Sequence, residues 1–379
     1  MLPQGENNKS ISTLKDINIE NILERKLIKT DLSDIGDYIK NEVVLVTGGG
    51  GSIGSEICRQ VSKLNPKELI ILDIYENNAY EIQQELLRRY KGDLNLKTII
   101  ASIRDKKRME MIFEKYKPKI IFHAAAHKHV PLMESDPSEA IKNNIFGTLN
   151  VVTLAHKYGA NNFVLISTDK AVNPTSIMGA SKRVAEMIVQ SIGENSETKF
   201  ACVRFGNVLG SNGSVIPLFK KQISEGGPIT ITHPEMVRYF MTISEAVGLV
   251  INAGAISNGG EVFVLDMGVP IKILDLAKKI IKINGFTPEK DIKIKIIGLR
   301  PGEKLYEEIL MQEEVVEKTK NNKIFISKAV KFDKSKLDLN LKKLEEIIDS
   351  ENDDMISIIK DIVPNYMKED MDEKSAVNN

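Results

Sequence analysis

Short apolar runs alternate with amphipathic stretches from residue 43 onward. Seven of the runs are rich in β-branched residues and mostly apolar throughout, at 43–46, 69–72, 97–100, 119–122, 163–167, 200–205 and 262–265. Such runs are typical of strands buried on both faces of a parallel sheet. Helical periodicity between them, as in 55–64, 80–90 and 108–116, predicts an α/β fold with a Rossmann-type doubly wound parallel sheet and right-handed crossovers.

The pattern changes after Phe205. Gly, Asn, Ser and Pro gather in 206–217 and 223–236, which predicts long loops and a smaller C-terminal α/β substrate lobe. A helix at 273–285, a strand at 291–298 and a final helix continue this lobe. The predicted organisation is an N-terminal arm (1–40), a nucleotide-binding Rossmann domain (41–206, with 237–266 returning to it), the lobe (207–236 and 267–366) and a flexible tail (367–379).

Composition narrows the class of protein. Among 379 residues, 52 Lys and Arg balance 52 Asp and Glu, so no long-range field draws in nucleic acid or an anionic membrane. Only two cysteines are present, Cys58 and Cys202, which argues for a reducing compartment and against a disulfide scaffold. No apolar run has the ~18 to 20 residues that a membrane helix needs. The expectation is a cytoplasmic protein without direct membrane insertion.

A glycine-rich segment, TGGGGSIG at 47–54, follows the first strand and opens a helix. Glycines allow a tight turn and let backbone N–H groups approach a pyrophosphate, which then faces the helix N-terminus. Gly48, Gly51 and Gly54 fit one spacing, and Gly49, Gly51 and Gly54 fit another, so the glycines alone leave the register open. The alternative is a strand–helix turn that binds no ligand.

Asp73 ends the second strand, 19 residues after Gly54. A carboxylate there accepts hydrogen bonds from ribose hydroxyls and repels a 2′-phosphate, which predicts NAD rather than NADP; the alternative is an Asp that only caps a helix. The predicted cofactor-binding residues are Thr47, Gly48, Gly51, Ser52, Ile53, Gly54, Asp73, Ser102, Ile103, Ala124, Ala125, Ala126, Lys128 and Lys182.

The segment HAAAHKHVP (123–131) closes the fourth strand. Its three alanines would let a cofactor lie close to the backbone, and Lys128 is placed to reach a ribose or phosphate. His127 and His129 resemble a metal pair, but no Cys or carboxylate cluster accompanies them in sequence. We therefore expect no metal site.

Thr168, Asp169 and Lys170 follow the fifth strand, at the carboxyl end where open α/β sheets place their chemistry. Met178 and Lys182 come next, four residues apart at the start of a helix, and therefore on one face. These five residues are the candidate catalytic group. Each alone has an ordinary alternative: Asp169 as a helix cap, and the lysines as solvated surface groups.

Together with TGGGGSIG, the string STDK…NP…MGASKR (167–183) resembles the extended short-chain dehydrogenase/reductase family. FGNVLGSNGSVIPLF (205–219) and RPGEKLYEE (300–308) are similar to the UDP-N-acetylglucosamine 4,6-dehydratases of capsule and glycan synthesis. Larger members carry an N-terminal membrane region. This chain shows none, which implies a soluble form or removal of that region. The resemblance also implies homo-oligomers.

One position departs from the wider family, because Met178 stands where a catalytic Tyr is usual. Met can neither accept nor donate a proton. One interpretation is a catalytically inactive NAD-binding scaffold. The other, which we favour, is the subgroup in which Met replaces Tyr and the Thr168–Asp169–Lys170 triplet takes over.

The resemblance implies NAD-dependent 4,6-dehydration of UDP-N-acetylglucosamine to a UDP-2-acetamido-2,6-dideoxy-4-keto-hexose, with retention at C5 favoured. In that reaction Asp169 protonates the leaving C6 hydroxyl and Lys170 removes the C5 proton. Thr168 would hydrogen-bond the C4 hydroxyl or the oxyanion, and Lys182 would bind the nicotinamide ribose. Burial would raise the pKa of Asp169 and lower that of Lys170, while their mutual attraction opposes both shifts. A UDP-sugar 4-epimerase is the alternative enzyme.

The same resemblance implies a UDP-sugar site on the lobe. Asn207, Ser214 and Val215 would bond the diphosphate. Arg238 and Arg300 would pair with it through their planar guanidinium groups. The remaining predicted substrate-binding residues are Lys128 and Glu303. The alternative is a set of turn motifs with incidental charges.

Overall fold

The computed structural model describes residues 22, 23, 25, 35–310, 316–327, 332–349 and 354–367. Most of the predicted N-terminal arm and all but the first residue of the predicted tail lie outside these residues. Several described residues of the arm contact the rest of the protein, and Ile39 is fully buried beneath the sheet helices. Ile22 is buried in the core of the smaller lobe, and Arg25 donates to a carboxylate oxygen of Glu245 at 2.7 Å.

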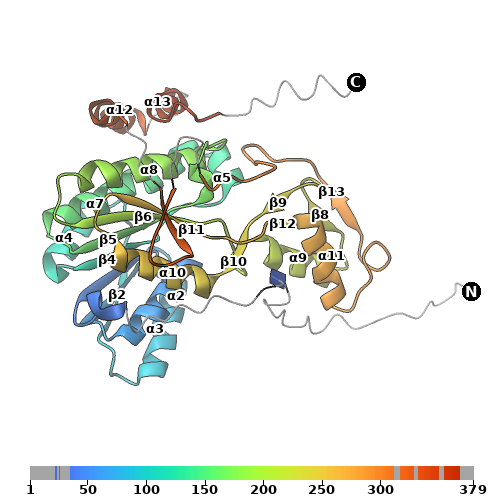
Figure 1. Ribbon diagram of the computed structural model, residues 1–379, viewed down its shortest axis with the longest axis horizontal. Helices are drawn as coiled ribbons and strands as arrows, with labels where there is room; N and C mark the ends of the chain where they lie inside the picture. Colours follow the sequence, from blue (N-terminus) through green and yellow to red (C-terminus); the bar gives the residue numbers. More distant parts are fainter. Residues whose placement is uncertain are drawn as a thin grey trace, which may run out of the picture.

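A nine-stranded sheet forms the centre of the molecule (Figure 1). Its strand order is β14-β15-β11-β6-β5-β4-β1-β2-β3. The seven parallel strands are β1 (Val43–Thr47), β2 (Glu68–Asp73), β3 (Leu96–Ile100), β4 (Ile120–His123), β5 (Asn162–Ile166), β6 (Lys199–Arg204) and β11 (Glu261–Leu265). All seven predicted strands are therefore confirmed. The order reverses between β1 and β4, where α/β sheets of this kind bind their ligands.

Helices cover both faces of the sheet (Figure 1). One face carries α2 (Ser52–Val61), α3 (Glu76–Tyr90) and α10 (Ile243–Ile256). The other carries α4 (Lys106–Tyr116), α7 (Thr148–Lys157) and α8 (Ile177–Gly193). Because the strands are covered on both sides, Val44, Leu45 and Val46 of β1 are all fully buried, as their unbroken apolar run predicts.

Short elements connect these layers. They are η1 (Gly36–Tyr38), η2 (Ser62–Leu64), α5 (Val130–Ser135), α6 (Pro137–Ala140), the π-helix η3 (Ile141–Gly147) and η4 (Asp169–Ala171). The single turn η4 begins three residues after β5 ends, and Thr168 caps it by accepting a hydrogen bond from the Lys170 backbone N–H. This turn fixes the candidate catalytic residues at the carboxyl edge of the sheet.

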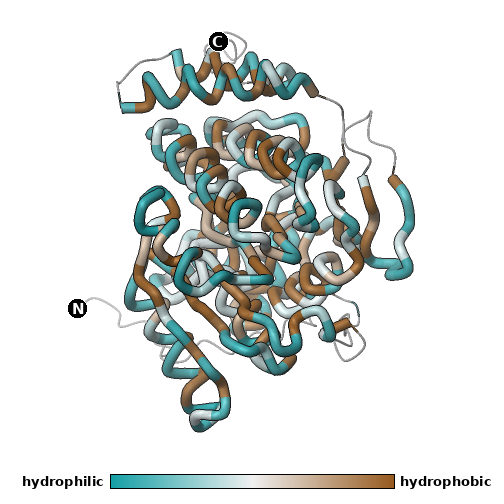
Figure 2. Tube along the Cα trace, turned by 90° about the vertical axis from the view of Figure 1, so that its left-hand side faces the viewer, coloured by the Kyte–Doolittle hydropathy of each residue, from teal (hydrophilic) through white to brown (hydrophobic). Residues whose placement is uncertain are grey.

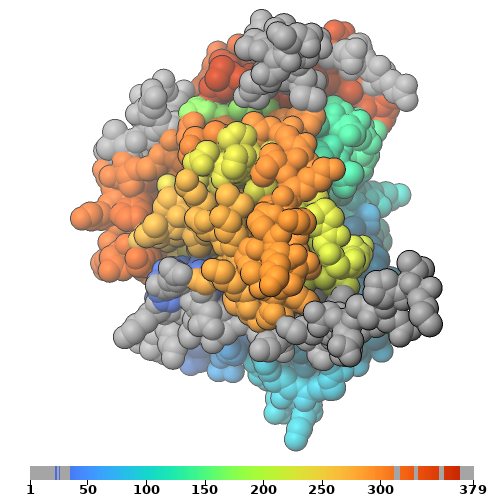
Figure 3. Space-filling view, turned by 90° about the vertical axis from the view of Figure 1, so that its right-hand side faces the viewer, coloured from blue at the N-terminus to red at the C-terminus, as the bar shows by residue number. Residues whose placement is uncertain are grey.

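The smaller lobe is built from segments that lie far apart in the sequence. Its helices are α9 (Val215–Ser224) and α11 (Ile273–Ile283), and its strands are β8 (Ile229–Ile231), β9 (Val237–Arg238), β12 (Ile271–Lys272) and β13 (Ile294–Ile296). β8 pairs with β13, and β9 pairs with β12. Figure 3 shows the yellow and orange parts of the chain merged on this face. β7 (Asn207–Leu209) and β10 (Phe240–Thr242) pair with each other and connect the lobe to the body.

The C-terminal part of the predicted lobe lies elsewhere. β15 (Ile324–Ser327) pairs antiparallel with β11, and β14 (Val316–Lys318) pairs antiparallel with β15 at the edge of the main sheet. α12 (Lys334–Ile347) and α13 (Asp354–Ile362) form a hairpin, shown in Figures 1 and 2 as a further layer beyond α8. The lobe therefore does not extend to residue 366. The short β9, placed in the returning segment 237–266, instead pairs within the lobe.

The helix α9 also differs from the expected loop at 206–217. Its apolar residues Ile216, Phe219 and Ile223 are buried in the core of the lobe. Their spacing of three and four is helical, but the Gly- and Asn-rich residues before it obscured the pattern. The predicted helix at 273–285 and strand at 291–298 are confirmed as α11 and β13.

Candidate functional site

The glycine-rich turn lies at the carboxyl end of β1, and its backbone settles the register. Gly48 has φ +64°, a conformation that favours glycine. A Cβ on Gly54 would lie 2.0 Å from the carbonyl oxygen of Gly48. Gly48, Gly51 and Gly54 line the cavity, whereas Gly49 packs toward Ile71 of β2. The Gly48–Gly51–Gly54 spacing is therefore the one that forms the turn.

We expect Gly54→Ala to lower the free energy of unfolding by about 2 kcal/mol, because the new methyl group overlaps a backbone oxygen that cannot move alone. Binding of a dinucleotide should weaken as well. Denaturant unfolding and a dinucleotide titration measure the two effects. Gly51→Ala is the matched comparison, since its Cβ would meet the same oxygen at 3.2 Å. If Gly51→Ala lowered the free energy of unfolding as much as Gly54→Ala, this account would be contradicted.

Asp73, at the end of β2, is oriented by the neighbouring backbone. Its Oδ2 accepts the Gly50 N–H at 2.8 Å and its Oδ1 accepts the Tyr75 N–H at 2.9 Å. It lines a cavity with Gly48, Gly51, Ser102, Ile103, Ala124, Ala125 and Ala126. A carboxylate held beside the glycine turn is suited to accept hydrogen bonds from a pair of hydroxyl groups.

A larger cavity of about 610 Å³ continues from the glycine turn toward the lobe. The predicted residues that it brings together are Gly48, Gly51, Ser52, Ile53, Gly54, Ala124, Ala126, Lys128, Thr168, Lys170, Met178, Lys182, Asn207, Ser214 and Val215. Segments far apart in the sequence thus meet around one space. The size suits a nucleotide together with a further ligand.

Thr47 does not line either cavity. Its hydroxyl lies 2.7 Å from Nδ1 of His123, whose Nε2 lies 3.0 Å from the hydroxyl of Thr148. Burial, aided by the charge of Lys182, lowers the pKa of His123 to about 3, so the imidazole is neutral. Thr47 therefore supports the floor of the site instead of facing a ligand.

The candidate acid–base pair lies on η4. Asp169 is 1% exposed, and its Oδ1 accepts hydrogen bonds from the Thr168 hydroxyl at 2.9 Å and from Lys170 Nζ at 3.0 Å. Its Oδ2 has no hydrogen-bond partner among the described residues. Lys170 Nζ also lies 3.4 Å from Oδ1 of Asn207. The predicted triplet is thus assembled at the junction of the body and the lobe.

The two titrating groups respond differently to this environment. Burial raises the pKa of Asp169, and the charge of Glu307 adds to the rise while Lys170 opposes it. Burial acts to lower the pKa of Lys170, but Asp169 and Glu307 outweigh it and the net pKa is raised. The environment therefore shifts Asp169 toward its protonated form, which an acid requires, and stabilises the ammonium form of Lys170, which a base must first lose.

Glu307 was not among the predicted site residues. Its Oε1 lies 3.2 Å from Lys170 Nζ and 3.4 Å from Nε of Arg238. It belongs to the RPGEKLYEE segment, where it is the fourth residue after Glu303. Only its acidic character at that place in the segment was visible in the sequence, and nothing there distinguished it from Glu308.

Met178 and Lys182 lie on α8 and face the same cavity. Lys182 is 4% exposed, and it makes no hydrogen bond or ion pair with the described residues. Burial lowers its pKa to about 8, partly offset by Glu186. A buried amine without a partner is costly unless a ligand pairs with it. Its position at the cavity wall suits contact with ligand hydroxyl groups.

A fully buried ion network lies behind this wall. Glu186 accepts hydrogen bonds from Arg204 at 2.7 Å, from Arg183 at 3.0 Å and from the Ser167 hydroxyl at 2.6 Å. These contacts lower the pKa of Glu186 to about 2 against the effect of its burial. The network joins α8 to the ends of β5 and β6, and so holds η4 in place.

Lys128 and Ser52 connect the body to the loop before α9. Lys128 Nζ donates to the carbonyl oxygen of Asn212 at 2.9 Å, and the Asn212 N–H donates to the Ser52 hydroxyl at 3.1 Å. The loop thereby closes over the cavity. Ser214 follows as the first residue before α9, and its buried hydroxyl has no partner among the described residues. The helix N-terminus faces the same space, a position that favours an anion.

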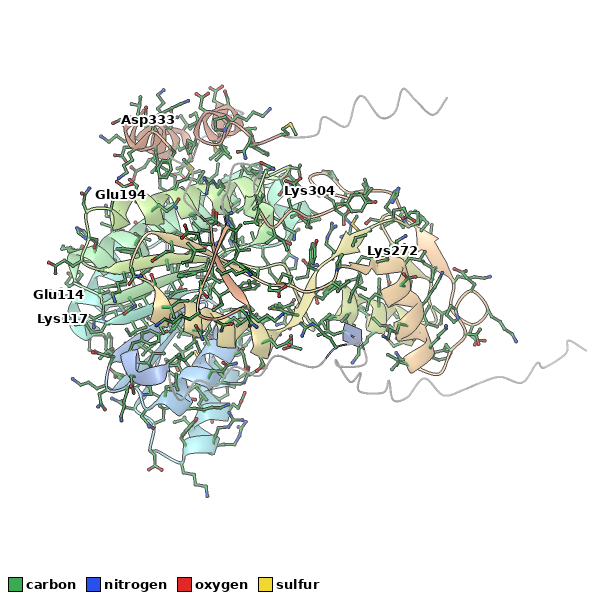
Figure 4. The ribbon with its side chains drawn as sticks, viewed as in Figure 1. Glu114, Lys117, Glu194, Lys272, Lys304 and Asp333 are labelled. Atoms are coloured by element: carbon green, nitrogen blue, oxygen red, sulfur yellow. The ribbon has the colours of Figure 1, made fainter. Side chains whose placement is uncertain are left out.

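A third cavity, of about 190 Å³, lies between the lobe and the body. The residues that line it include Asn207, Arg238, Arg300, Glu303 and Glu307. Arg300 faces it, and the backbone N–H of Arg300 donates to Glu303 at 3.2 Å. In Figure 4, Lys304 marks the segment that reaches back over the body, where Lys304 Nζ donates to the carbonyl oxygen of Val172 at 3.0 Å.

Arg238, which the sequence analysis assigns to the diphosphate, makes several contacts within the protein. Its guanidinium donates to the backbone carbonyl oxygens of Val237 at 2.7 Å, Lys304 at 2.7 Å and Leu305 at 3.2 Å. The ion pair with Glu307 occupies its Nε. Most of its donors are therefore committed to holding the 300–308 segment, which leaves Arg300 as the more available cation.

This arrangement can hold a dinucleotide at the glycine turn and can exchange protons with a ligand held between Lys170 and the lobe. Within the described part of the chain, no three His, Cys, Asp or Glu side chains gather as metal ligands would. No described helix has the length and apolar character needed to cross a membrane.

Comparison with known sequences gives a consistent result. A family model described as "Polysaccharide biosynthesis protein" matches residues 44–329. The capsular polysaccharide biosynthesis protein CapD of Staphylococcus aureus is 50% identical over 360 residues, which are 95% of this chain and 57% of that protein. The chain thus spans just over half the length of that relative.

Two further proteins are similar over most of their length. A UDP-N-acetylglucosamine 4,6-dehydratase (inverting) of Campylobacter jejuni is 35% identical over 273 residues, which are 70% of this chain and 76% of that protein. The solved structure of Pen from Bacillus thuringiensis is 38% identical with a TM-score of 0.70, and the match covers 76% of this chain and 90% of that one. The Rossmann-type α/β fold is shared with the Pen structure.

Proposed function

Since the chain belongs to the polysaccharide biosynthesis protein family, we propose that it dehydrates UDP-N-acetylglucosamine at C4–C6 to a UDP-2-acetamido-2,6-dideoxy-4-keto-hexose for surface polysaccharide or glycan synthesis. The observation that carries this proposal is the Asp169–Lys170 pair at 3.0 Å, with Asp169 buried and Lys170 half-buried at the edge of the sheet beside the cavity. An acid and a potential base in contact suit the removal of water from adjacent carbon atoms.

The cofactor that we propose is NAD. The structure fits it in three respects: the close glycine turn, the carboxylate of Asp73 beside that turn, and the unpartnered amine of Lys182 in the cavity wall. Gly48, Gly51 and Gly54 would hold the pyrophosphate, and Asp73 the adenosine ribose. When bound, NAD supplies the hydride acceptor and donor that such a dehydration requires.

The UDP-sugar would lie across the junction of body and lobe. The N-terminus of α9, the hydroxyl of Ser214 and the guanidinium of Arg300 are suited to its diphosphate. Arg238 would shape this site by holding the 300–308 segment. The sugar would then reach Thr168, Asp169 and Lys170, which line or adjoin the cavity between these elements.

Residues of the chain itself would carry out the proton transfers. Asp169 would donate a proton to the C6 hydroxyl as it leaves, consistent with the raised pKa of this carboxyl. Lys170 would take the proton from C5 and later return it. Thr168, which donates to Asp169, is positioned to orient the C4 hydroxyl.

Incubation of the protein and NAD with UDP-N-acetylglucosamine in deuterated water tests this proposal. We expect a product that has lost one water and carries deuterium at C5, because Lys170 exchanges its protons with solvent. The configuration at C5 is read from the same product: the family resemblance favours retention, whereas the Campylobacter relative is named for inversion.

Two other outcomes would overturn the proposal. A product of unchanged mass with inverted C4 would identify a UDP-sugar 4-epimerase, which needs no proton donor for C6. NAD binding without turnover of any tested UDP-sugar would identify a non-catalytic scaffold.

A further inference from the structure

Glu307 forms a third member of the acid–base pair. Its side chain is 3% exposed, and its Oε1 contacts Lys170 Nζ at 3.2 Å. Its Oε2 has no hydrogen-bond partner among the described residues. A buried carboxylate normally satisfies both oxygens, so one left open is suited to receive a proton or a ligand hydroxyl.

Charged groups from three elements face this carboxylate. Lys170 and Asp169 approach from η4, Arg238 approaches from β9 at 3.4 Å, and Lys304 belongs to the same segment as Glu307. Glu307 lines the cavity at the junction of body and lobe together with Lys170. It therefore lies beside the site where the proposed reaction takes place.

The proposed dehydration poses a problem that this geometry answers. Lys170 can remove the C5 proton only as a neutral amine, yet it lies between two carboxyl groups that favour its ammonium form. Its proton has two acceptors in direct contact, Asp169 and Glu307. Asp169 must keep a proton of its own for the C6 hydroxyl, which leaves Glu307 as the acceptor.

We propose that Glu307 is a positioning residue that holds Lys170 and takes its ammonium proton, so that the neutral amine can act on C5. This inference rests on the proposed function. The first step breaks one N–H bond of Lys170 and forms an O–H bond on Glu307. The amine then takes the C5 proton, the C5–H electron pair forms the C5–C6 double bond, and the C6 oxygen leaves with the proton of Asp169 as water.

The protons balance over one turnover. After C6 is reduced, Lys170 returns its proton to C5, and Glu307 returns the stored proton to Lys170. The proton that the C4 hydroxyl releases on oxidation passes to solvent, because Asp169 is still protonated at that stage, and Asp169 takes up a proton from solvent after the water has left. In the resting site, burial acts to raise the pKa of Glu307, but Lys170 and Arg238 outweigh it and the net pKa is lowered, so the resting group is the carboxylate.

The variant Glu307→Gln tests the inference, because the amide keeps the shape of the side chain but cannot accept the proton at neutral pH. We expect water loss and deuterium uptake at C5 to fall about 100-fold at pH 7. Lys170 must then lose its proton to solvent, so the remaining rate should rise about tenfold per pH unit between roughly pH 6 and 9, while the wild-type rate changes little.

Glu308→Gln is the matched control on the same segment. Glu308 accepts a hydrogen bond from Asn173 at 2.5 Å and has no contact with Lys170, so we expect the rate and pH profile of the wild type. Glu307→Asp restores a carboxylate at a greater distance and should give an intermediate rate with no steep rise with pH.

A Glu307→Gln variant with the wild-type pH profile would overturn the inference, whatever its rate, since a purely structural loss does not change the profile. Should that variant not fold, a steep rise with pH in Glu307→Asp would overturn it equally. The measurement on the wild type distinguishes the two proposals. If the wild type releases no water, the proposed function is wrong, whereas a failure seen only in the Glu307 variants contradicts this inference alone.

Discussion

Asp169→Asn is expected to reduce the release of water from the sugar about 1000-fold at pH 7, the largest effect that we predict for a single side chain. The amide has the size of the carboxyl group and can still accept a hydrogen bond from the Thr168 hydroxyl, which lies 2.9 Å from Oδ1 of Asp169 in the wild type. It has no proton to give to the C6 hydroxyl. The loss should therefore fall on the chemical step and not on binding of the sugar nucleotide.

Mass analysis of the product and deuterium uptake at C5 of recovered sugar would measure the two half-steps separately. Uptake should persist, because Lys170 and Glu307 remain. The temperature of thermal unfolding should not fall, since the variant removes a carboxyl group whose charged form is already disfavoured by burial. The exposed Asp93 provides the control variant Asp93→Asn. Retention of more than a tenth of the wild-type rate in Asp169→Asn would refute the acid role.

Lys182→Met should produce opposite changes in activity and stability. The amine is 4% exposed and has a pKa of about 8 in place of 10.5. At about 1.4 kcal/mol per pKa unit, the folded protein gives up about 3 kcal/mol below pH 8 to keep this group charged. A methionine of similar length removes that cost. We therefore expect a more stable protein whose turnover is reduced 100-fold or more, because the positive charge beside the ligand is lost.

The stabilisation expected in Lys182→Met could come from the removal of a buried charge or from better packing. The pH dependence of stability distinguishes these two causes. Between pH 8 and 10.5 the unfolded chain binds the lysine proton while the folded chain has released it, so the contribution of Lys182 to stability rises with pH over that interval. Denaturant unfolding at pH 7 and pH 10 should show this rise in the wild type and its absence in Lys182→Met. An equal rise in both proteins would show that Lys182 is not the titrating group.

The features that depend only on residues close together in the sequence were predicted correctly. The apolar runs placed all seven parallel strands, because a strand buried on both faces has the same signature wherever it lies in the chain. The spacing of glycines and the Thr168–Asp169–Lys170 triplet likewise depend only on neighbours a few residues away. Both were found at the carboxyl edge of the sheet, where the alternation of strands and helices predicts ligand binding.

The features that the sequence did not reveal concern partners far apart in the chain. Arg238 was predicted to pair with a diphosphate, and the contacts of its guanidinium with three backbone carbonyl oxygens and Glu307 were not foreseen. The segment 316–366 was assigned to the lobe, although it adds two strands to the sheet and a helical hairpin beyond α8. Neither outcome has a signature within a short window of residues.

The amino-acid sequence by itself determined the parallel sheet, the glycine turn and the place of Asp169 and Lys170 directly after a strand, since each follows from residue type and short-range periodicity. Only the tertiary structure decided which group titrates in which direction and which glutamate contacts Lys170. Glu307 is 137 residues away from Lys170 along the chain, and the two side chains meet because the 300–308 segment folds back over the carboxyl edge of the sheet. A pKa depends on distance and burial in space, and neither quantity is written in the order of the residues.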